Sequence, residues 1–439
     1  MSNAAIRYIR PSDTKRKAPR LIGYKAAREL IVNSTQLESL PENARPQLEA
    51  IVSHWLQFPE TNPILLNEKY GDVWRKLLAT KADSRLEKAN YGKPRVKRSG
   101  LYGRVNFRGI PFPPVSGERF TFIDLFAGIG GFRIALRSLG GKCVFSSEWN
   151  LYSQKTYDRN FGEMPFGDIK IFTDNTVSNA QIRRWIPDHD ILTAGFPCQP
   201  FSKAGVSARN SLGRTHGFAC KTQGTLFFDV IRIANAKRPK VLLLENVKNL
   251  VRHDNGNTFK IIQKAIRDIG YSFEPILLDA STLVPQRRQR YYLVCFRDSN
   301  EPFPFLPFTG KPKALKSILQ KNPEARYTIS ERLWKGHQNR TARNRSRGVG
   351  FTALKANIDL PANTLVARYY KDGKECLVPL PTGGPPRKLT PKECARLQGF
   401  PEKFKPNTSD SQAYRQFGNS VAIPVVRKVA IKILEKLGK

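Results

Sequence analysis

Residues 120–133 read FTFIDLFAGIGGFR, a short apolar run followed by a turn with glycines at 128, 130 and 131. The run predicts a buried strand, and the glycines let the turn bring its backbone close to a ligand. Glu148 stands twenty residues beyond Gly128, a spacing at which a carboxylate can bond ribose hydroxyls, and Trp149 offers a flat face for adenine. The stretch predicts a nucleoside-cofactor site. A tight strand-to-helix turn beside a solvated acid is the alternative.

Similar apolar runs recur after this stretch and alternate with segments of helical periodicity. Strands are predicted at residues 120–126, 142–147, 191–194, 241–244 and 291–296, and helices at 132–139, 225–236 and 258–269. This alternation predicts a doubly wound α/β domain with a largely parallel sheet. Because the carboxyl ends of parallel strands meet at one edge, side chains that follow the strands should lie close together.

Two chemically reactive side chains are predicted at that edge. Cys198 lies in GFPCQPFS, after the strand at 191–194, between two prolines that stiffen the loop. Glu245 follows the strand at 241–244, in ENV. A cysteine nucleophile with a paired carboxyl group explains both positions. A structural thiol and a strand-end ion pair are the separate alternatives, and they leave the pairing unexplained.

The charge of the chain indicates a polyanionic partner. Its 439 residues hold 74 Lys and Arg against 36 Asp and Glu, a formal net charge of +38, which favours nucleic acid. The first residues have no apolar signal segment and no run is long enough to span a bilayer, so a cytoplasmic protein without membrane contact is expected. The six cysteines form no CxxC pair, so neither a metal site nor a disulfide framework is expected.

Composition divides the chain into four parts. Residues 1–117 are interpreted as a basic N-terminal extension that contacts DNA, and 118–297 as the catalytic α/β domain. Residues 298–386 hold an acid-free stretch from 332 to 358 and predict a smaller basic domain. Residues 387–439 end in a helix whose apolar positions, from Val425 to Leu437, share one face, and this helix is expected to pack back on the catalytic domain.

Six motifs, in order, resemble those of the DNA (cytosine-5) methyltransferase family over about 320 residues from Phe120 to the C-terminus. They are FIDLFAGIGGFR, GFPCQPFS, ENVKNL, QRRQRYYLV, RKLTPKECARLQGFP and QFGNSVAIPV. The insert NSLGRTHGFACKTQGTLFFDVIRI and the later LVARYYKDG are similar to the Dcm-type subgroup of bacterial modification methyltransferases, whose members methylate a cytosine within CC(A/T)GG.

The resemblance implies a reaction. Carbon 5 of cytosine is a poor nucleophile, so the family adds a cysteine thiolate to carbon 6, and the ring then attacks the sulfonium methyl group of S-adenosyl-L-methionine. Cys198 would be the nucleophile, and Glu245 would hydrogen-bond or protonate ring nitrogen 3 and hold the exocyclic amine. Arg288 and Arg290 would stabilise the flipped base and help hold the thiolate. Without the resemblance, ordinary surface charge explains Arg288 equally well.

The resemblance also implies binding residues and a class I S-adenosylmethionine-dependent methyltransferase sheet. The cofactor residues would be Phe126, Gly128, Ile129, Gly131, Glu148, Trp149, Asp168, Ile169, Leu226, Asn419 and Ser420. A lid at residues 202–223 would close over DNA, and 298–386 would be the target-recognition domain. The DNA-binding residues would be Ser202, Ser207, Arg209, Arg214, Arg343, Arg345, Arg347, Thr364, Arg368 and Lys371.

The implied biology is that of a bacterial restriction-modification system. The partners would be double-stranded DNA and a cognate restriction endonuclease that acts on the same site, and the enzyme would work as a nucleoid-associated monomer. The target atoms lie inside the stacked duplex, so the nucleotide must be extruded into the pocket.

Competing functions fit the residues less completely. A cytosine-5 RNA methyltransferase shares the Cys and Glu chemistry but does not require a basic domain at 298–386. A non-enzymatic DNA-binding regulator fits the charge but leaves Cys198, Glu245 and the glycine turn unexplained. A zinc deaminase would need His-x-Glu and Cys-x-x-Cys ligands, and an amino-group methyltransferase an Asn/Asp-Pro-Pro-aromatic loop; the sequence contains neither.

Overall fold

The computed structural model describes residues 22–59, 61–87, 105–197, 226–299, 301–348 and 353–439. Its strands are β1 (Ile22–Gly23), β2 (Val105–Asn106), β3 (Phe120–Leu125), β4 (Gly141–Ser147), β5 (Ile191–Gly195), β6 (Val241–Val247), β7 (Glu274–Asp279), β8 (Gln289–Phe296), β9 (Leu377–Val378) and β10 (Arg387–Lys388). Short 3₁₀ turns lie at Leu37–Ser39, Arg45–Gln47, Lys248–Gly256, Leu315–Ile318 and Ala325–Tyr327.

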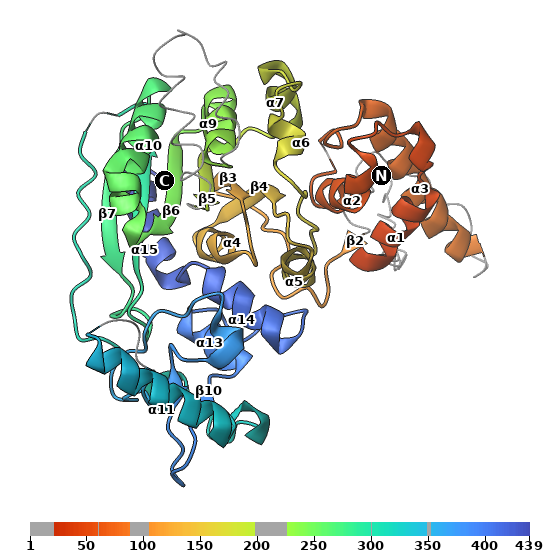
Figure 1. The fold of residues 1–439 in the computed structure, drawn as a ribbon. Coiled ribbons are helices and arrows are strands. Elements are labelled where there is room, and N and C mark those ends of the chain that lie inside the picture. The colour runs from red at the N-terminus through yellow and green to blue at the C-terminus, as the bar shows by residue number, and fades with distance from the viewer. Residues whose placement is uncertain (1–21, 60, 88–104, 198–225, 300, 349–352) are drawn as a thin grey trace, which may run out of the picture.

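The helices surround this framework (Figure 1). They are α1 (Tyr24–Ser34), α2 (Leu48–Gln57), α3 (Glu68–Glu87), α4 (Gly131–Arg137), α5 (Leu151–Phe161), α6 (Lys170–Thr173), α7 (Asn179–Trp185), α9 (Leu226–Lys237), α10 (Asn257–Asp268), α11 (Glu331–Ser346), α12 (Tyr369–Asp372), α13 (Pro391–Leu397), α14 (Asp410–Asn419) and α15 (Ile423–Lys436). None of the helices in the described ranges is long and apolar enough to cross a membrane.

Six strands form the central sheet, in the order β4-β3-β5-β6-β8-β7. The four strands from β4 to β6 are parallel, and β8 runs antiparallel to both β6 and β7. The sheet is therefore mixed rather than largely parallel throughout. The five predicted strands are confirmed with small shifts of their ends. Strand β7 was not predicted; its alternating half-buried residues and Pro275 suit an edge strand.

Side chains that alternate along the strands supply two cores, one on each face of the sheet. On β3, Ile123 and Leu125 belong to one core and Phe120 and Phe122 to the other. The first core also contains the apolar residues of α7, α9 and α10, and the second those of α4, α13, α14 and α15. Helices on both faces explain why the strands are apolar in continuous runs. The final helix packs on α4, as its apolar face predicts.

The N-terminal helices extend the first core beyond the sheet. Ile31, Ile51 and Trp55 are fully buried and belong to the same cluster as Phe145 of β4. His54 of α2 bonds the carbonyl oxygen of Val144, so α2 approaches the edge strand itself. Figure 1 shows α1, α2 and α3, in red and orange, on the β4 side of the molecule. One hydrophobic core therefore includes residues from both sides of position 117, where the N-terminal extension was expected to end.

Candidate active site

The glycine-rich turn after β3 adopts a backbone that few residue types tolerate. Gly128 has φ +56° and Gly130 φ +85°, and Phe126 has a positive φ of 55° despite its side chain. A Cβ atom at Gly130 would overlap the ring of Phe161, whereas the space beside Gly128 is open for 4 Å. Gly130 is thus required by packing, and Gly128 borders open space at the carboxyl end of the sheet. Ile129 between them is buried.

Glu148 is bound to this turn. Its Oε2 accepts a hydrogen bond from the N–H of Gly128 at 2.8 Å, and its Oε1 accepts from the N–H of Asn150 at 2.8 Å. Burial raises the pKa of the Glu148 carboxyl, while these backbone donors oppose the rise. The neighbouring Trp149 is 79% exposed, which is unusual for so large an apolar ring. The turn thus has a fixed carboxylate and a free aromatic face beside it.

Asp168 and Ile169 lie on a segment that runs beside β4. Phe166 forms a parallel bridge with Ser147, and the N–H of Glu148 donates to the carbonyl of Phe166 at 2.8 Å. Asp168 is exposed and Ile169 buried. Through these contacts the segment that carries Asp168 and Ile169 lies beside Glu148, at the carboxyl end of β4.

The remaining cofactor candidates lie at two other element ends. Ser420 follows α14, and its Oγ would be 3.0 Å from a Cβ atom at Gly131, so it lies against the glycine turn. Asn419 is exposed at the end of α14. Leu226 is half-buried at the first position of α9.

Glu245 lies near the carboxyl end of the neighbouring strand β6, with its side chain largely buried. In the parallel register Gly195 of β5 lies opposite Glu245, and a Cβ atom at Gly195 would be 3.8 Å from the Glu245 Oε2. The Nε of Arg290 approaches the Glu245 Oε1 at 3.2 Å. This ion pair orients the carboxylate at the edge of the sheet.

Asn246 is a site residue that the sequence analysis missed. Its side-chain Nδ2 donates to the carbonyl of Phe196 at 2.8 Å, and its Oδ1 accepts from the N–H of Val247. The bond ties the end of β6 to the segment that follows β5. Its position beside Glu245 in ENV was the available signal.

Five candidates lie outside the described residues. They are Cys198, Ser202, Ser207, Arg209 and Arg214. Pro197 is the last described residue before Cys198, and Gly195, two residues earlier, lies opposite Glu245.

Arg288 is fully enclosed and bonds backbone carbonyl groups. Its guanidinium donates to the oxygens of Leu365 at 3.1 Å, Gly418 at 3.3 Å and Ser420 at 2.6 Å. Burial, with Arg290 nearby, lowers its pKa to about 9. Arg288 therefore joins the segment at 365 to the turn that carries Ser420, a contact that surface charge would not explain.

Thr364 lies on a segment held against the start of β8. Its Oγ1 donates to the carbonyl of Arg287 at 2.5 Å, and the N–H of Leu365 donates to the Oε1 of Gln286 at 2.7 Å. Gln286 is completely buried and also donates to Leu397 at 3.2 Å. The Thr-Leu pair is thereby attached to the catalytic sheet.

The other DNA-binding candidates are exposed. Arg343, Arg345 and Arg347 lie at the C-terminal end of α11, and Arg368 and Lys371 lie at α12. An ion pair of 3.9 Å between Arg340 and Asp372 links the two helices. The structure thus keeps these cations in solvent on two connected helices.

Comparison with known proteins gives the family. The model of the C-5 cytosine-specific DNA methylase family matches residues 120–435. A DNA-cytosine methyltransferase of Escherichia coli (strain K12) is 44% identical over 384 residues, and the match covers 74% of this chain and 80% of the relative. The chain belongs to the C-5 cytosine-specific DNA methylase family.

A type II methyltransferase is a further relative, and a solved structure shares the fold. The type II methyltransferase M.HhaI of Haemophilus parahaemolyticus is 39% identical over 339 residues, covering 71% of this chain and 93% of the relative. The crystal structure of the S. pombe Dnmt2 methyltransferase matches with a TM-score of 0.56 at 19% identity, over 73% of this chain and 100% of that chain. The structural likeness supports the α/β methyltransferase fold.

The methylase sheet also buries an acid that gives a pH-dependent prediction. Asp124 is completely buried, and burial raises its pKa to about 8, although Thr193 donates to its Oδ1 at 3.2 Å. Between about pH 4 and pH 8 the folded chain keeps a proton that the unfolded chain releases, so the free energy of unfolding should fall as pH rises. The slope is at most about 1.4 kcal/mol per pH unit.

An Asp124→Asn variant should lose this slope because its amide does not titrate. Denaturant unfolding of both proteins at about pH 6 and about pH 8 measures the difference. Equal slopes in the two proteins would show that Asp124 is ionised in the folded state.

Proposed function

We propose that the protein transfers a methyl group from S-adenosylmethionine to carbon 5 of a flipped cytosine in a short double-stranded DNA site. The observation that carries the proposal is the meeting of β5 and β6, where Gly195 lies opposite Glu245. The chain that leads to Cys198 leaves the sheet beside this carboxylate, and Asn246 bonds Phe196 at that point. A nucleophile and an acid on adjacent strand ends suit a reaction on one small ring.

The residues at the glycine turn fit the cofactor. The open space beside Gly128 admits a ligand at the backbone, the Glu148 carboxylate is fixed beside it, and the Trp149 ring is free on its outer face. These residues, with Asp168, Ile169 and Ser420, would hold the nucleoside and the amino-acid part. Phe126, Ile129, Gly131, Leu226 and Asn419 would complete the site. When bound, S-adenosylmethionine supplies an electrophilic methyl group.

Each residue at the edge has a proposed role. The Cys198 thiolate adds to carbon 6 of cytosine, which makes carbon 5 nucleophilic. After methyl transfer a base removes the proton on carbon 5, and the thiolate leaves carbon 6. Glu245 donates a proton or a hydrogen bond to ring nitrogen 3 and binds the exocyclic amine, so that the electron density pushed into the ring is stabilised. Arg290 keeps the Glu245 carboxylate oriented through the 3.2 Å contact. Arg288 holds together the backbone segments that surround the base pocket.

We also propose that residues 298–386 read the DNA. The exposed arginines of α11 and the cations at α12 would contact phosphates or guanine edges, and Thr364 would lie where the recognition segment meets the catalytic sheet.

Residues 202–223 would close over the extruded base, with Ser202, Ser207, Arg209 and Arg214 on the DNA. The basic extension at 1–117 would add phosphate contacts, and a cognate endonuclease would act on the same site.

Bisulfite sequencing of unmethylated DNA after incubation with the protein and S-adenosylmethionine tests this function. Methylated cytosines should resist conversion at one position of one short recurring sequence, and the sample without S-adenosylmethionine should show none. Complete conversion at every cytosine, or methyl transfer to RNA in preference to DNA, would contradict the proposal.

A further inference from the structure

Three polar side chains of the N-terminal helical unit bind one strip of main chain in the catalytic domain. The strip runs from residue 161 to residue 167 and leads directly to Asp168. The hydrogen bonds are Gln57 Nε2 to the oxygens of Phe161 (3.1 Å) and Gly162 (2.8 Å), the N–H of Met164 to Ser53 Oγ (3.0 Å), and the N–H of Gly167 to Gln47 Oε1 (2.7 Å). The two segments therefore run in opposite directions: Gln57, at the end of α2, bonds the start of the strip, and Gln47, just before α2, bonds its end.

Gly167 is held on both sides of its backbone. Gln47 accepts from its N–H, and the Oγ of Ser147, the last residue of β4, donates to its carbonyl oxygen at 2.8 Å. A Cβ atom at Gly167 would lie 3.1 Å from the Gln47 Nε2, so the amide of Gln47 lies directly against the Gly167 backbone. These two bonds fix the backbone of residue 167 relative to the sheet.

The next two residues of the strip are cofactor candidates. The Asp168 Oδ1 accepts from the N–H of Lys170 at 3.0 Å, which fixes the carboxyl group relative to its own backbone. Ile169 is buried. The positions of these two side chains depend on the backbone that follows Gly167. A substitution at Gln47 that shifts Gly167 would therefore also shift Asp168 and Ile169.

We propose that Gln47 is a positioning residue for S-adenosylmethionine, acting through Gly167 on Asp168 and Ile169. The inference rests on the proposed function, because it assumes that the cofactor lies against those two residues. Gln47 stands outside residues 120–435, the part that the family model matches. The N-terminal unit therefore supplies a support for the cofactor site from outside the family's own domain.

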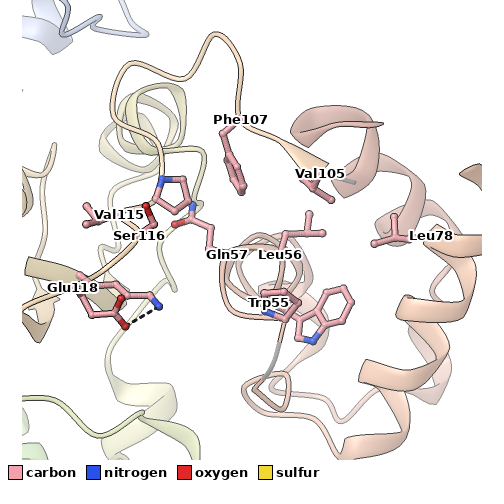
Figure 2. Close-up of a pocket in the computed structure, with 12 residues that line it drawn as sticks. Trp55, Leu56, Gln57, Leu78, Val105, Phe107, Val115, Ser116 and Glu118 are labelled. Atoms are coloured by element: carbon pink, nitrogen blue, oxygen red, sulfur yellow. Dashed lines mark hydrogen bonds and ion pairs between the residues drawn. The ribbon is translucent and has the colours of Figure 1, made fainter. Parts of the chain in front are cut away.

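The opposite end of α2 offers a matched control. Gln57 lies at a cavity of about 260 Å³ between the N-terminal helices and the sheet (Figure 2), whose walls also include Trp55, Phe107 and Glu118. Its bonds reach Phe161 and Gly162, which stand seven and six residues before Asp168. A Gln57 substitution removes these contacts, and also the acceptor of a 3.2 Å hydrogen bond from Arg133 of α4. Ser53→Ala, which removes the bond to the N–H of Met164 and leaves the Arg133 contact intact, is therefore the second control.

The test compares Gln47→Met, Gln47→Glu and Gln57→Met in the full chain. Methionine keeps the length of glutamine but has no oxygen acceptor, and glutamate retains one for the N–H of Gly167. Gln47→Met should weaken S-adenosylmethionine binding roughly five- to tenfold, the loss expected for one hydrogen bond, and should raise KM for S-adenosylmethionine with little change in kcat. Gln47→Glu should restore binding to within about twofold, and Gln57→Met should lower Tm while leaving the Kd unchanged.

Titration calorimetry with S-adenosylmethionine measures the Kd, and Ser53→Ala is measured beside Gln57→Met with the same expected result. Equal Kd values for Gln47→Met and the wild type, with the wild type binding normally, would overturn this inference and leave the proposed function standing. An equal loss of binding in Ser53→Ala would also overturn it, because the effect would then be one of stability. A wild-type chain that does not bind S-adenosylmethionine would overturn both.

Discussion

A Cys198→Ser variant is expected to lose methyl transfer by on the order of a thousandfold or more. The serine hydroxyl is hardly ionised at neutral pH, so it adds to carbon 6 far more slowly than a thiolate does. Carbon 5 then stays a poor nucleophile whether or not the cofactor is bound. Transfer of a labelled methyl group to DNA, under single-turnover conditions, measures the chemical step.

The binding functions of Cys198→Ser should remain. Its affinities for DNA and for S-adenosylmethionine should stay within about twofold of the wild type, because the substitution changes a single side-chain atom. Turnover at a wild-type rate in a correctly folded variant would eliminate the proposed nucleophile.

Glu245→Gln is expected to lower kcat by roughly a hundredfold to ten-thousandfold, the range for loss of an acid and of an electrostatic stabiliser. Glutamine preserves the shape of the side chain but cannot transfer a proton to ring nitrogen 3. It also leaves Arg290 without the carboxylate that lies 3.2 Å from its Nε. The loss should appear in kcat rather than in the KM for S-adenosylmethionine, because Glu148 and the glycine turn are unchanged.

Glu118→Gln is the control for Glu245→Gln. Glu118 also forms an ion pair of 3.2 Å, with Lys142, but it lies before β3 at the opposite edge of the same sheet. The same substitution there removes a carboxylate whose ion pair has the same length of 3.2 Å, and it should leave kcat within about twofold of the wild type. A similar loss of activity in both variants would point to stability, and full activity in Glu245→Gln would exclude the acid role.

The strands of the catalytic sheet can be predicted from the sequence because buried apolar residues follow one another within a few positions. Continuous apolar runs identified β3, β4, β5, β6 and β8, since these strands are covered on both faces. The edge strand β7 was missed because one of its faces is largely exposed and its sequence EPILLD begins with Glu and Pro. Its antiparallel partner β8 could not be oriented from periodicity, which is the same for both directions.

The site was predictable to the extent that strand ends converge. Parallel register brings Glu245 beside the chain that leads to Cys198. The spacing placed Glu148 near the glycine turn, and its carboxylate accepts from the N–H of Gly128 there; a bond from Glu148 to ribose hydroxyls stays a prediction. Arg288 bonds Leu365 and Ser420, which are 77 and 132 positions away in the sequence. No local sequence pattern predicts contacts over such separations. The same holds for Gln47 and Gly167, whose hydrogen bond spans 120 positions.

Covalent trapping on DNA that contains 5-fluorocytosine tests most directly whether Cys198 bonds to the base. After methyl transfer the fluorine on carbon 5 cannot leave as a proton does, so the thioether to carbon 6 should persist. We expect a complex that survives denaturation, requires S-adenosylmethionine, and maps by mass spectrometry to the peptide containing Cys198. A protein that methylates ordinary cytosine in the same site yet forms no such complex, or forms it through another residue, would exclude Cys198 as the nucleophile.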